Sequence, residues 1–257
     1  MLLIIDGLNF LWRAKFSFGD SSENSLIFNF FRNLKAIIEQ FKPTEVLFVK
    51  EGKSNFRYDI YHEYKAKRNY DSDSNKSFHA SKRKALELLT LTKVKQVYID
   101  YLECDDTISC LVQNNDDSIV VSTDTDFIQL LQHFKLKLYN PVKKTFVTPP
   151  DYDYCRNKVL CGDKTDNIEK LLTPAKAMKL TLNDQLFNDW YVNNKEKYDL
   201  NFKLISLINE YNSKDIIEIE NKTDLSLLKK EFESMDFKSL INDKYWNKFE
   251  KIMNYSY

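Results

Sequence analysis

Acidic residues follow several short apolar runs of this chain, and this arrangement constrains its fold more than any other feature. The apolar runs cover residues 2–5, 97–99 and 119–121, and acidic residues follow at position 6 and in segments 103–106 and 122–126. Runs of this length are typical of buried strands. Because open α/β sheets bind ligands in a crevice at the carboxyl ends of their strands, we expect these acidic side chains to meet at one sheet edge.

Helical and strand-like patterns alternate through the first 150 residues. Apolar side chains in residues 25–41 form one helical stripe, after which Pro43 ends the helix. Further helices are expected at 77–91, 105–112 and 127–133, and strands at 2–5, 45–49, 97–99, 119–121 and 135–139. This alternation predicts an α/β fold with a parallel-rich central sheet covered by helices.

From Pro149 onward we expect helices only. Apolar stripes occur at 152–160, 182–192, 202–211, 225–232 and 245–253. The predicted organisation is therefore an α/β core at 1–150, followed by a C-terminal helical extension at 151–257. Within the core, residues 57–78 break the alternation with basic, aromatic and polar side chains, which indicates a loop-rich segment.

The charges of the chain balance overall but not locally. Lys and Arg together number 38, as do Asp and Glu, so the formal net charge is zero. Residues 53–84 nevertheless hold nine basic residues against four acidic ones. Local segregation of this kind can attract nucleic acid even when the net charge cannot.

Cysteine spacing and hydropathy predict the compartment. The four cysteines form no CxxC pair, which favours free thiols in a reducing environment. The N-terminal apolar run lacks the basic start of a signal peptide, and no run approaches membrane-spanning length. We therefore expect a cytoplasmic protein, in a cell or in an infected host, that makes no membrane contact.

The grouping of carboxylates predicts a binding site for divalent cations. Asp124 and Asp126 lie on the same side of an extended backbone, and Asp163 and Asp166 face one way on a helical turn. Like charges at close range destabilise a site unless cations neutralise them. Oxygen ligands without accompanying His or Cys favour Mg²⁺ or Mn²⁺ over zinc.

Each acidic motif also has a simpler interpretation. Asp124 and Asp126 could form a polar turn that caps the helix expected at Phe127, and Asp105 or Asp106 could cap the next helix in the same way. Segment 162–167 could be a solvated turn. The repetition of such motifs along the chain favours the metal interpretation over these alternatives.

The motifs resemble, in order and spacing, those of the 5′-nuclease family, which includes flap endonucleases, the 5′-3′ exonuclease domain of bacterial DNA polymerase I and bacteriophage 5′-3′ exonucleases. The chain is most similar to the bacteriophage RNase H type. The resemblance spans residues 1–167 and fades after about residue 170. The segments that carry it are Asp6 with its neighbours, 64–68, 103–106, 124–127 and 162–167.

The resemblance implies a PIN-like 5′-nuclease core and a DNA-binding helical region. It implies metal-dependent hydrolysis of phosphodiesters at or near the 5′ ends of flapped or nicked duplex DNA and RNA–DNA hybrids, as in primer removal. Two Mg²⁺ ions are expected, with Mn²⁺ as a substitute. The expected metal-binding residues are Asp6, Glu103, Asp105, Asp106, Asp124, Asp126, Asp163 and Asp166.

The same resemblance gives roles to basic residues. Lys65 and Arg68 are expected to act catalytically on the scissile phosphate, since Lys neutralises charge and Arg grips a phosphate with two hydrogen bonds. A charged surface helix is the alternative for this segment. The residues expected to bind nucleic acid are Arg13, Arg57, Tyr64, Lys67 and Lys76, with Tyr64 suited to stacking on a base.

Two positions depart from the family pattern. After the second expected strand the family usually has an Asp, whereas this chain has Val49 and Lys50, so Glu51 is a candidate replacement. The Gly-rich helix-turn-helix that follows segment 162–167 in the family is replaced by residues 168–177, which contain no glycine. The usual close approach of backbone to phosphate is therefore in doubt there.

Two other functions fit parts of the pattern. A chain that has lost its strand-end Asp could be a catalytically weakened protein that binds flap or fork DNA, although a pure binding protein gains nothing from carboxylates that face phosphates. A PIN-class ribonuclease would share the fold, but segment 162–167 and the basic segment argue against it. The expected partners are DNA with a 5′ flap, nick or fork, RNA–DNA hybrids, and a single-strand-binding or replication protein, for a protein that is itself a monomer.

Overall fold

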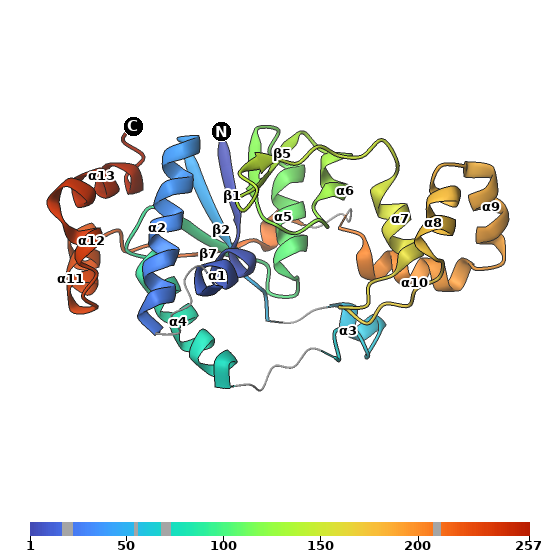
Figure 1. Cartoon of the computed structure of the whole chain (residues 1–257), viewed down its shortest axis with the longest axis horizontal. Coiled ribbons are helices and arrows are strands. Elements are labelled where there is room, and N and C mark those ends of the chain that lie inside the picture. The colour runs from blue at the N-terminus through green and yellow to red at the C-terminus, as the bar shows by residue number, and fades with distance from the viewer. Residues whose placement is uncertain (17–22, 54–55, 68–72, 208–211) are drawn as a thin grey trace.

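The computed structural model describes residues 1–16, 23–53, 56–67, 73–207 and 212–257, and a mixed sheet crosses the middle of this part of the chain (Figure 1). The strand order is β6-β5-β4-β1-β2-β3-β7. The strands are β1 (Leu2–Asp6), β2 (Glu45–Val49), β3 (Lys95–Tyr98), β4 (Ser118–Val121), β5 (Leu136–Asn140), β6 (Thr145–Phe146) and β7 (Ile217–Ile219).

The five inner strands are parallel, and the two edge strands are antiparallel. This confirms the expected α/β fold with a parallel-rich sheet. The expectation that no strand follows Pro149 is wrong, because β7 pairs with β3 at the sheet edge. β7 has three residues and is largely exposed, so it lacks the apolar run by which a buried strand is recognised.

Helices connect the core strands. They are α1 (Gly7–Phe16), α2 (Glu23–Phe41), α3 (Phe56–Ile60), α4 (Asp73–Leu89), α5 (Cys104–Gln113) and α6 (Ile128–Leu131). The next group is α7 (Tyr154–Cys161), α8 (Pro174–Thr181), α9 (Asp184–Val192) and α10 (Lys195–Ile205), and the last is α11 (Leu225–Ser234), α12 (Lys238–Ile241) and α13 (Asp243–Met253), after a short 3-10 turn at Ser213–Asp215. The end of the helix expected at 202–211 lies outside the described residues.

Strand alternation divides the core into two layers. Leu3 and Ile5 of β1 join an apolar cluster formed with α1, α2 and α4, whereas Leu2 and Ile4 point to the opposite face and pack with α5 and α6. Asp6 continues the second series by alternation. Its side chain therefore emerges on the α5 face, at the carboxyl end of the strand.

The C-terminal helices α11–α13 extend the first layer. Phe31 of α2 contacts Phe232 of α11 with ring centroids 5.0 Å apart, and Phe249 of α13 packs against both rings. All three side chains are fully buried. Residues 225–253 therefore contribute to the same apolar cluster as the helices on this face of the sheet.

Helices α7–α10 form a separate unit, here called the helical lobe, at the other end of the molecule (Figure 1). Val159, Leu160, Ala177 and Leu204 lie in its own apolar cluster. Side chains of the core hold the segment that leaves the lobe. Gln129 donates to the Ile205 carbonyl at 3.3 Å and accepts from the Leu207 amide at 2.8 Å.

Within the described residues, no helix has the length and apolar character needed to cross a membrane.

The aromatic contacts of α13 generate a stability prediction. Phe249→Ala should lower the free energy of unfolding by about 3–5 kcal/mol, because it removes a buried ring and leaves a cavity between α2, α11 and α13. Urea unfolding measures this change. Leu227→Ala, at a side chain that is 42% exposed in α11, is the matched control and should cost far less. Equal losses in the two variants would contradict the packing described.

Candidate active site

A crevice of about 430 Å³ lies between the carboxyl edge of the sheet and the helical lobe. Eight carboxylates and three cationic side chains line it, together with a few apolar and amide groups. The carboxylates are Asp6, Glu51, Glu103, Asp105, Asp124, Asp126, Asp163 and Asp166, and the cations are Arg57, Lys65 and Lys158. The crevice thus brings together seven of the eight expected metal-binding residues.

Asp6 stands at the end of the central strand and is held rigidly. Its Oδ1 accepts the Asn9 backbone N–H at 3.1 Å, and its Oδ2 accepts the Ser122 hydroxyl at 2.6 Å. The Asn9 amide also donates to Thr123 at 2.7 Å. These bonds join the start of α1 to the turn after β4, so the two adjacent strand ends share one polar network.

The turn after β4 presents two carboxylates. Asp124 Oδ1 accepts the Asp126 backbone N–H at 2.8 Å, which closes a local turn. The start of α6 has no side-chain cap, so neither residue caps this helix as the simpler interpretation proposed. Both side chains line the crevice instead.

Helix α5 places its acidic residues differently. Asp105 lines the crevice, whereas Asp106 is fully buried and lies outside the lining. Successive helical residues point about 100° apart, which explains the difference. Arg57 holds Asp106 with both terminal nitrogens, one of them at 2.8 Å from Oδ1. This differs from the expectation that Asp106 binds metal, since its oxygens already pair with a guanidinium.

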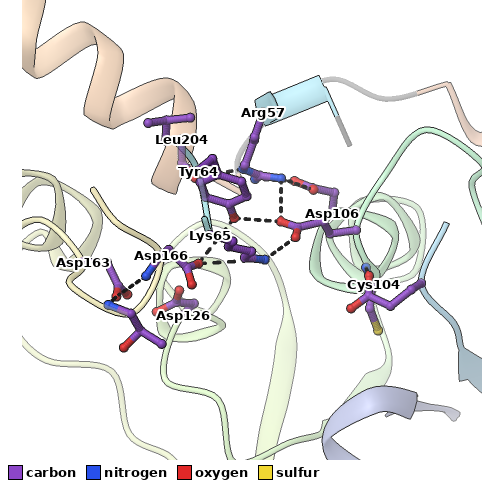
Figure 2. A network of polar contacts seen from close by, with 12 residues as sticks. Arg57, Tyr64, Lys65, Cys104, Asp106, Asp126, Asp163, Asp166 and Leu204 are labelled. Carbon is purple, nitrogen blue, oxygen red and sulfur yellow. Dashed lines mark hydrogen bonds and ion pairs between the residues drawn. The ribbon is translucent and has the colours of Figure 1, made fainter. Parts of the chain in front are cut away.

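Arg57 and Tyr64 also differ from the expectation that they contact nucleic acid. Each side chain is 2% exposed. Arg57 donates to the Leu204 carbonyl at 2.8 Å and to Glu103 at 3.2 Å, while the Tyr64 hydroxyl donates to Glu103 at 2.9 Å (Figure 2). A buried ring that donates to a carboxylate has no face available for stacking on a base. Both residues fix the Glu103 carboxylate.

Lys65 extends this network towards the helical lobe. Its ammonium pairs with Glu103 and lies 3.9 Å from Asp166 (Figure 2). Its backbone N–H donates to the Asp166 carbonyl at 2.9 Å, and its φ of 55° lies in the left-handed region that most residues avoid. The Lys65 side chain thus lies between Glu103 of the core and Asp166 of the loop after α7.

The loop after α7 carries the other two carboxylates. Gly162 ends α7 with a φ of 66°, and a Cβ there would lie 2.3 Å from the Glu169 carbonyl, so only glycine fits. Asp163 Oδ1 accepts the Thr165 backbone N–H at 2.8 Å. This loop is a turn, as the simpler interpretation expected, but both Asp163 and Asp166 line the crevice.

Sequence reasoning missed Lys158. This residue of α7 pairs with Asp126 and lies 3.3 Å from Asp163, so it links carboxylates of the core and the lobe. Burial of the ammonium opposes its charge, but these two acids raise the pKa of Lys158 above its usual value. The sequence offered only its position, a lysine near the end of the helix expected at 152–160 and four residues before segment 162–167.

The remaining predicted nucleic-acid contacts are not among the residues that line the crevice. Lys67 and Lys76 are exposed, and Arg13 is half-buried in α1. Burial lowers the pKa of Arg13 from its usual value. Arg68, predicted to be catalytic, lies outside the described residues.

Burial opposes the ionisation of several crevice acids. It raises the pKa of Asp6 to about 7, although the Ser122 and Asn9 hydrogen bonds act in the opposite direction. Burial likewise raises the pKa of Asp126 to about 6 despite Lys158, and it raises the pKa values of Glu51 and Asp105. Neighbouring carboxylates add to the shift of Asp105, chiefly Asp6. Without a bound cation, the crevice therefore disfavours the charged forms of several of its own acids.

The fold and the crevice define a family of nucleases, and the chain belongs to it. The family model described as "5'-3' exonuclease, N-terminal resolvase-like domain" matches residues 1–159. This confirms the resemblance found in the sequence. It also assigns β1 to β6 and the helices between them to the part of the chain that defines the family.

Individual relatives give the same result. A 5′-3′ exonuclease of Buchnera aphidicola subsp. Schizaphis graminum is 25% identical over 187 residues, which cover 65% of this chain and 64% of that protein. DNA polymerase I of Chloroflexus aurantiacus is 26% identical over 194 residues, 65% of this chain and 20% of that protein. The chain thus spans less than two thirds of the length of these curated relatives.

The fold is shared with a solved phage enzyme. The bacteriophage T5 flap endonuclease, in a pseudo-enzyme-product complex with DNA and metal ions, superimposes with a TM-score of 0.64 at 18% identity over 98% of both chains. The likeness therefore extends beyond the family model into the helical lobe and the C-terminal helices.

The raised pKa values predict how the metal-free protein responds to pH. A buried acid with a raised pKa keeps its proton in the folded state at pH values where the unfolded chain has lost it, so stability is full below the unfolded pKa and falls as pH rises towards the folded one. For Asp6 this window runs from its ordinary value of 3.8 to about 7. Each retained proton contributes a slope of about 1.4 kcal/mol per pH unit.

Urea unfolding with a metal chelator should therefore show lower stability at neutral pH than at mildly acidic pH. Asp6→Asn should flatten this dependence, whereas Asp116→Asn, at a side chain that is 85% exposed, should leave it unchanged. A metal-free protein that becomes more stable with rising pH would contradict the burial of charge described here.

Proposed function

We propose that this chain is a metal-dependent, structure-specific 5′ nuclease that hydrolyses phosphodiesters at or near the 5′ ends of flapped or nicked duplex DNA and RNA–DNA hybrids, as in primer removal. The gathering of eight carboxylates around three cations in one crevice carries this proposal. Membership of the 5′-3′ exonuclease family supports it. A protein that only binds DNA would lose affinity by directing so much negative charge at phosphates.

The crevice residues fit divalent cations. Oxygen atoms of Asp6 and Asp105 lie within 4.8 Å of each other, and burial disfavours their charge unless a cation is near. Mg²⁺ suits such hard oxygen ligands, with Mn²⁺ as a substitute. Asp6, Glu103, Asp105 and Asp124 would hold one ion, and Asp126, Asp163 and Asp166 the other. Bound metal would supply an activated water and stabilise the leaving oxygen.

The cationic residues would have two roles: one would neutralise charge on the phosphate, and the others would position the carboxylates. Lys65 lies between the two carboxylate groups, where an ammonium can neutralise charge that builds on a scissile phosphate. Arg57 and Tyr64 keep Glu103 in place, and the Arg57–Asp106 pair anchors α3 to α5. Lys158 holds the Asp163 loop against the core.

Duplex DNA would approach across the basic segment beside the crevice. Lys67 and Lys76 are exposed, so they are positioned for phosphate contacts, and Arg68 lies in the same segment. The T5 flap endonuclease, which shares the fold, was crystallised with DNA and metal ions, and this supports DNA as the substrate. A 5′ flap, nick or fork is the substrate feature that the proposal requires.

Removing one carboxylate should separate cleavage from binding. Asp124→Asn or Asp163→Asn should abolish most Mg²⁺-dependent cleavage of a labelled 5′ flap, because an ion loses a ligand, while DNA affinity stays similar or improves through reduced repulsion. Cleavage and fluorescence-anisotropy assays on the same flap, nick and RNA–DNA substrates measure both effects. Full activity in either variant would remove that residue from the metal site, and a wild-type chain that binds but never cleaves would favour a binding protein.

Lys65 and Lys67 provide a second contrast. Lys65→Ala should slow single-turnover cleavage at saturating enzyme, because its ammonium lies in the crevice at 12% exposure. Lys67→Ala should chiefly weaken binding and reduce its salt dependence, as expected for one phosphate contact. An unchanged single-turnover rate in Lys65→Ala would show that this lysine has no part in the chemistry.

A further inference from the structure

Strand β2 ends without a carboxylate, unlike strands β1 and β4 of the same sheet. β1 ends in Asp6 and β4 leads into Asp124, but the residue of β2 in register with Asp6 is Val49. Val49 is fully buried in the apolar cluster that includes Cys104. Lys50 does not line the crevice, and its ammonium lies 5.2 Å from the centre of the Tyr98 ring.

The chain reaches the crevice two residues later, at Glu51. The next residue, Gly52, lies so close to the end of β3 that a Cβ would be 2.2 Å from the Ile99 carbonyl, and its N–H donates to the Leu102 carbonyl at 3.0 Å. Only glycine permits this approach, because any side chain would collide with backbone. The contact places Glu51 directly over the start of α5.

Glu51 meets the N-terminus of α5 with one of its two oxygens. Oε2 accepts the Cys104 backbone N–H at 2.9 Å, a favourable contact for an anion at a helix start. The side chain also lines the crevice beside Asp6, Glu103 and Asp105. Burial is the main cause of the raised pKa values of Asp6 and Asp105, and the negative charge of Glu51 adds to both, so the three carboxyl groups are close enough to repel each other.

We infer that Glu51 supplies the ligand that β2 lacks, and binds, together with Asp6 and Asp105, a hard divalent cation such as Mg²⁺ or Mn²⁺. The inference rests on the proposed metal-dependent function and makes it specific. The longer side chain of Glu starts two residues beyond the strand end and lines the same crevice as Asp6 and Asp105. The α5 hydrogen bond holds one oxygen and directs the carboxylate towards the ion.

The test measures Mn²⁺ binding to the full chain without nucleic acid, and electron paramagnetic resonance and calorimetry are the two readouts. Glu51→Gln keeps an oxygen that can accept the Cys104 N–H but removes the charge, so it separates metal binding from helix capping. It should weaken binding of an ion by about tenfold or more. Glu87→Gln, at a side chain that is 69% exposed on α4, is the matched control and should bind as the wild type does.

A stability measurement gives an independent readout. Without metal at neutral pH, Glu51→Gln should raise the melting temperature, because it relieves repulsion in the crevice. With Mn²⁺ the wild type should gain more stability than the variant, since a ligand that binds only the folded state stabilises it more when its dissociation constant is lower. Loss of a structural hydrogen bond alone would lower stability in both conditions and would contradict the inference.

A second variant tests the position itself. Adding Val49→Asp to Glu51→Gln should restore part of the lost affinity, because residue 49 stands beside Asp6 in register. Wild-type Mn²⁺ affinity in Glu51→Gln would overturn the inference. If Asp124→Asn then weakens Mn²⁺ binding, the proposed metal-dependent function stands without Glu51. If neither variant affects Mn²⁺, the metal-dependent function fails as well.

Discussion

Repulsion between carboxylates is the constraint on which the rest of this structure depends. Eight acids line one crevice, and burial raises the pKa values of several of them. Such a cluster persists only where the scaffold fixes each group more strongly than the charges drive them apart. The sheet, helix α5 and the loop after α7 each hold part of the cluster through backbone hydrogen bonds, such as those of Asp6, Asp124 and Asp163.

Three cationic side chains of the crevice offset part of the repulsion between its carboxylates. Arg57 is fully committed to Asp106, Glu103 and the backbone of the lobe, so its role is to position other groups. Lys65 and Lys158 each lie between carboxylates of the core and the lobe. Each lysine therefore links the carboxylates of the core to those of the helical lobe.

The strand ends could be predicted from sequence because they depend on local patterns. Asp6 and Asp124 follow apolar runs, and the parallel sheet brings those runs side by side. The roles of Arg57 and Tyr64 could not be predicted, because their burial depends on how α3 and the turn after it dock between α5 and the lobe. Lys158 was missed for the same reason. Its partners come from the turn after β4 and from the loop after its own helix, and a helical stripe does not predict partners across the crevice.

The edge strand β7 and the position of Val49 show a further limit of prediction from the sequence. β7 is a strand because it pairs with β3, and a segment of three residues is too short for its sequence to predict that pairing. The sequence indicates that the family's strand-end Asp is absent, but it leaves open whether Val49 or Lys50 takes its place. Register with Asp6 decides between them, because it places Val49 at the strand end and leaves Lys50 outside the crevice.

Because the acids are concentrated in the crevice, the rest of the chain carries a formal positive charge. The formal charge of the whole chain is zero, yet the crevice holds eight acids and three bases. All remaining residues together therefore carry a surplus of five positive charges. In the proposed metal-bound state, each divalent cation would displace protons from acids whose pKa values burial raises, so the net gain would be smaller than two charges per ion. The attraction of the protein to nucleic acid would then depend on its ion content as well as on its basic residues.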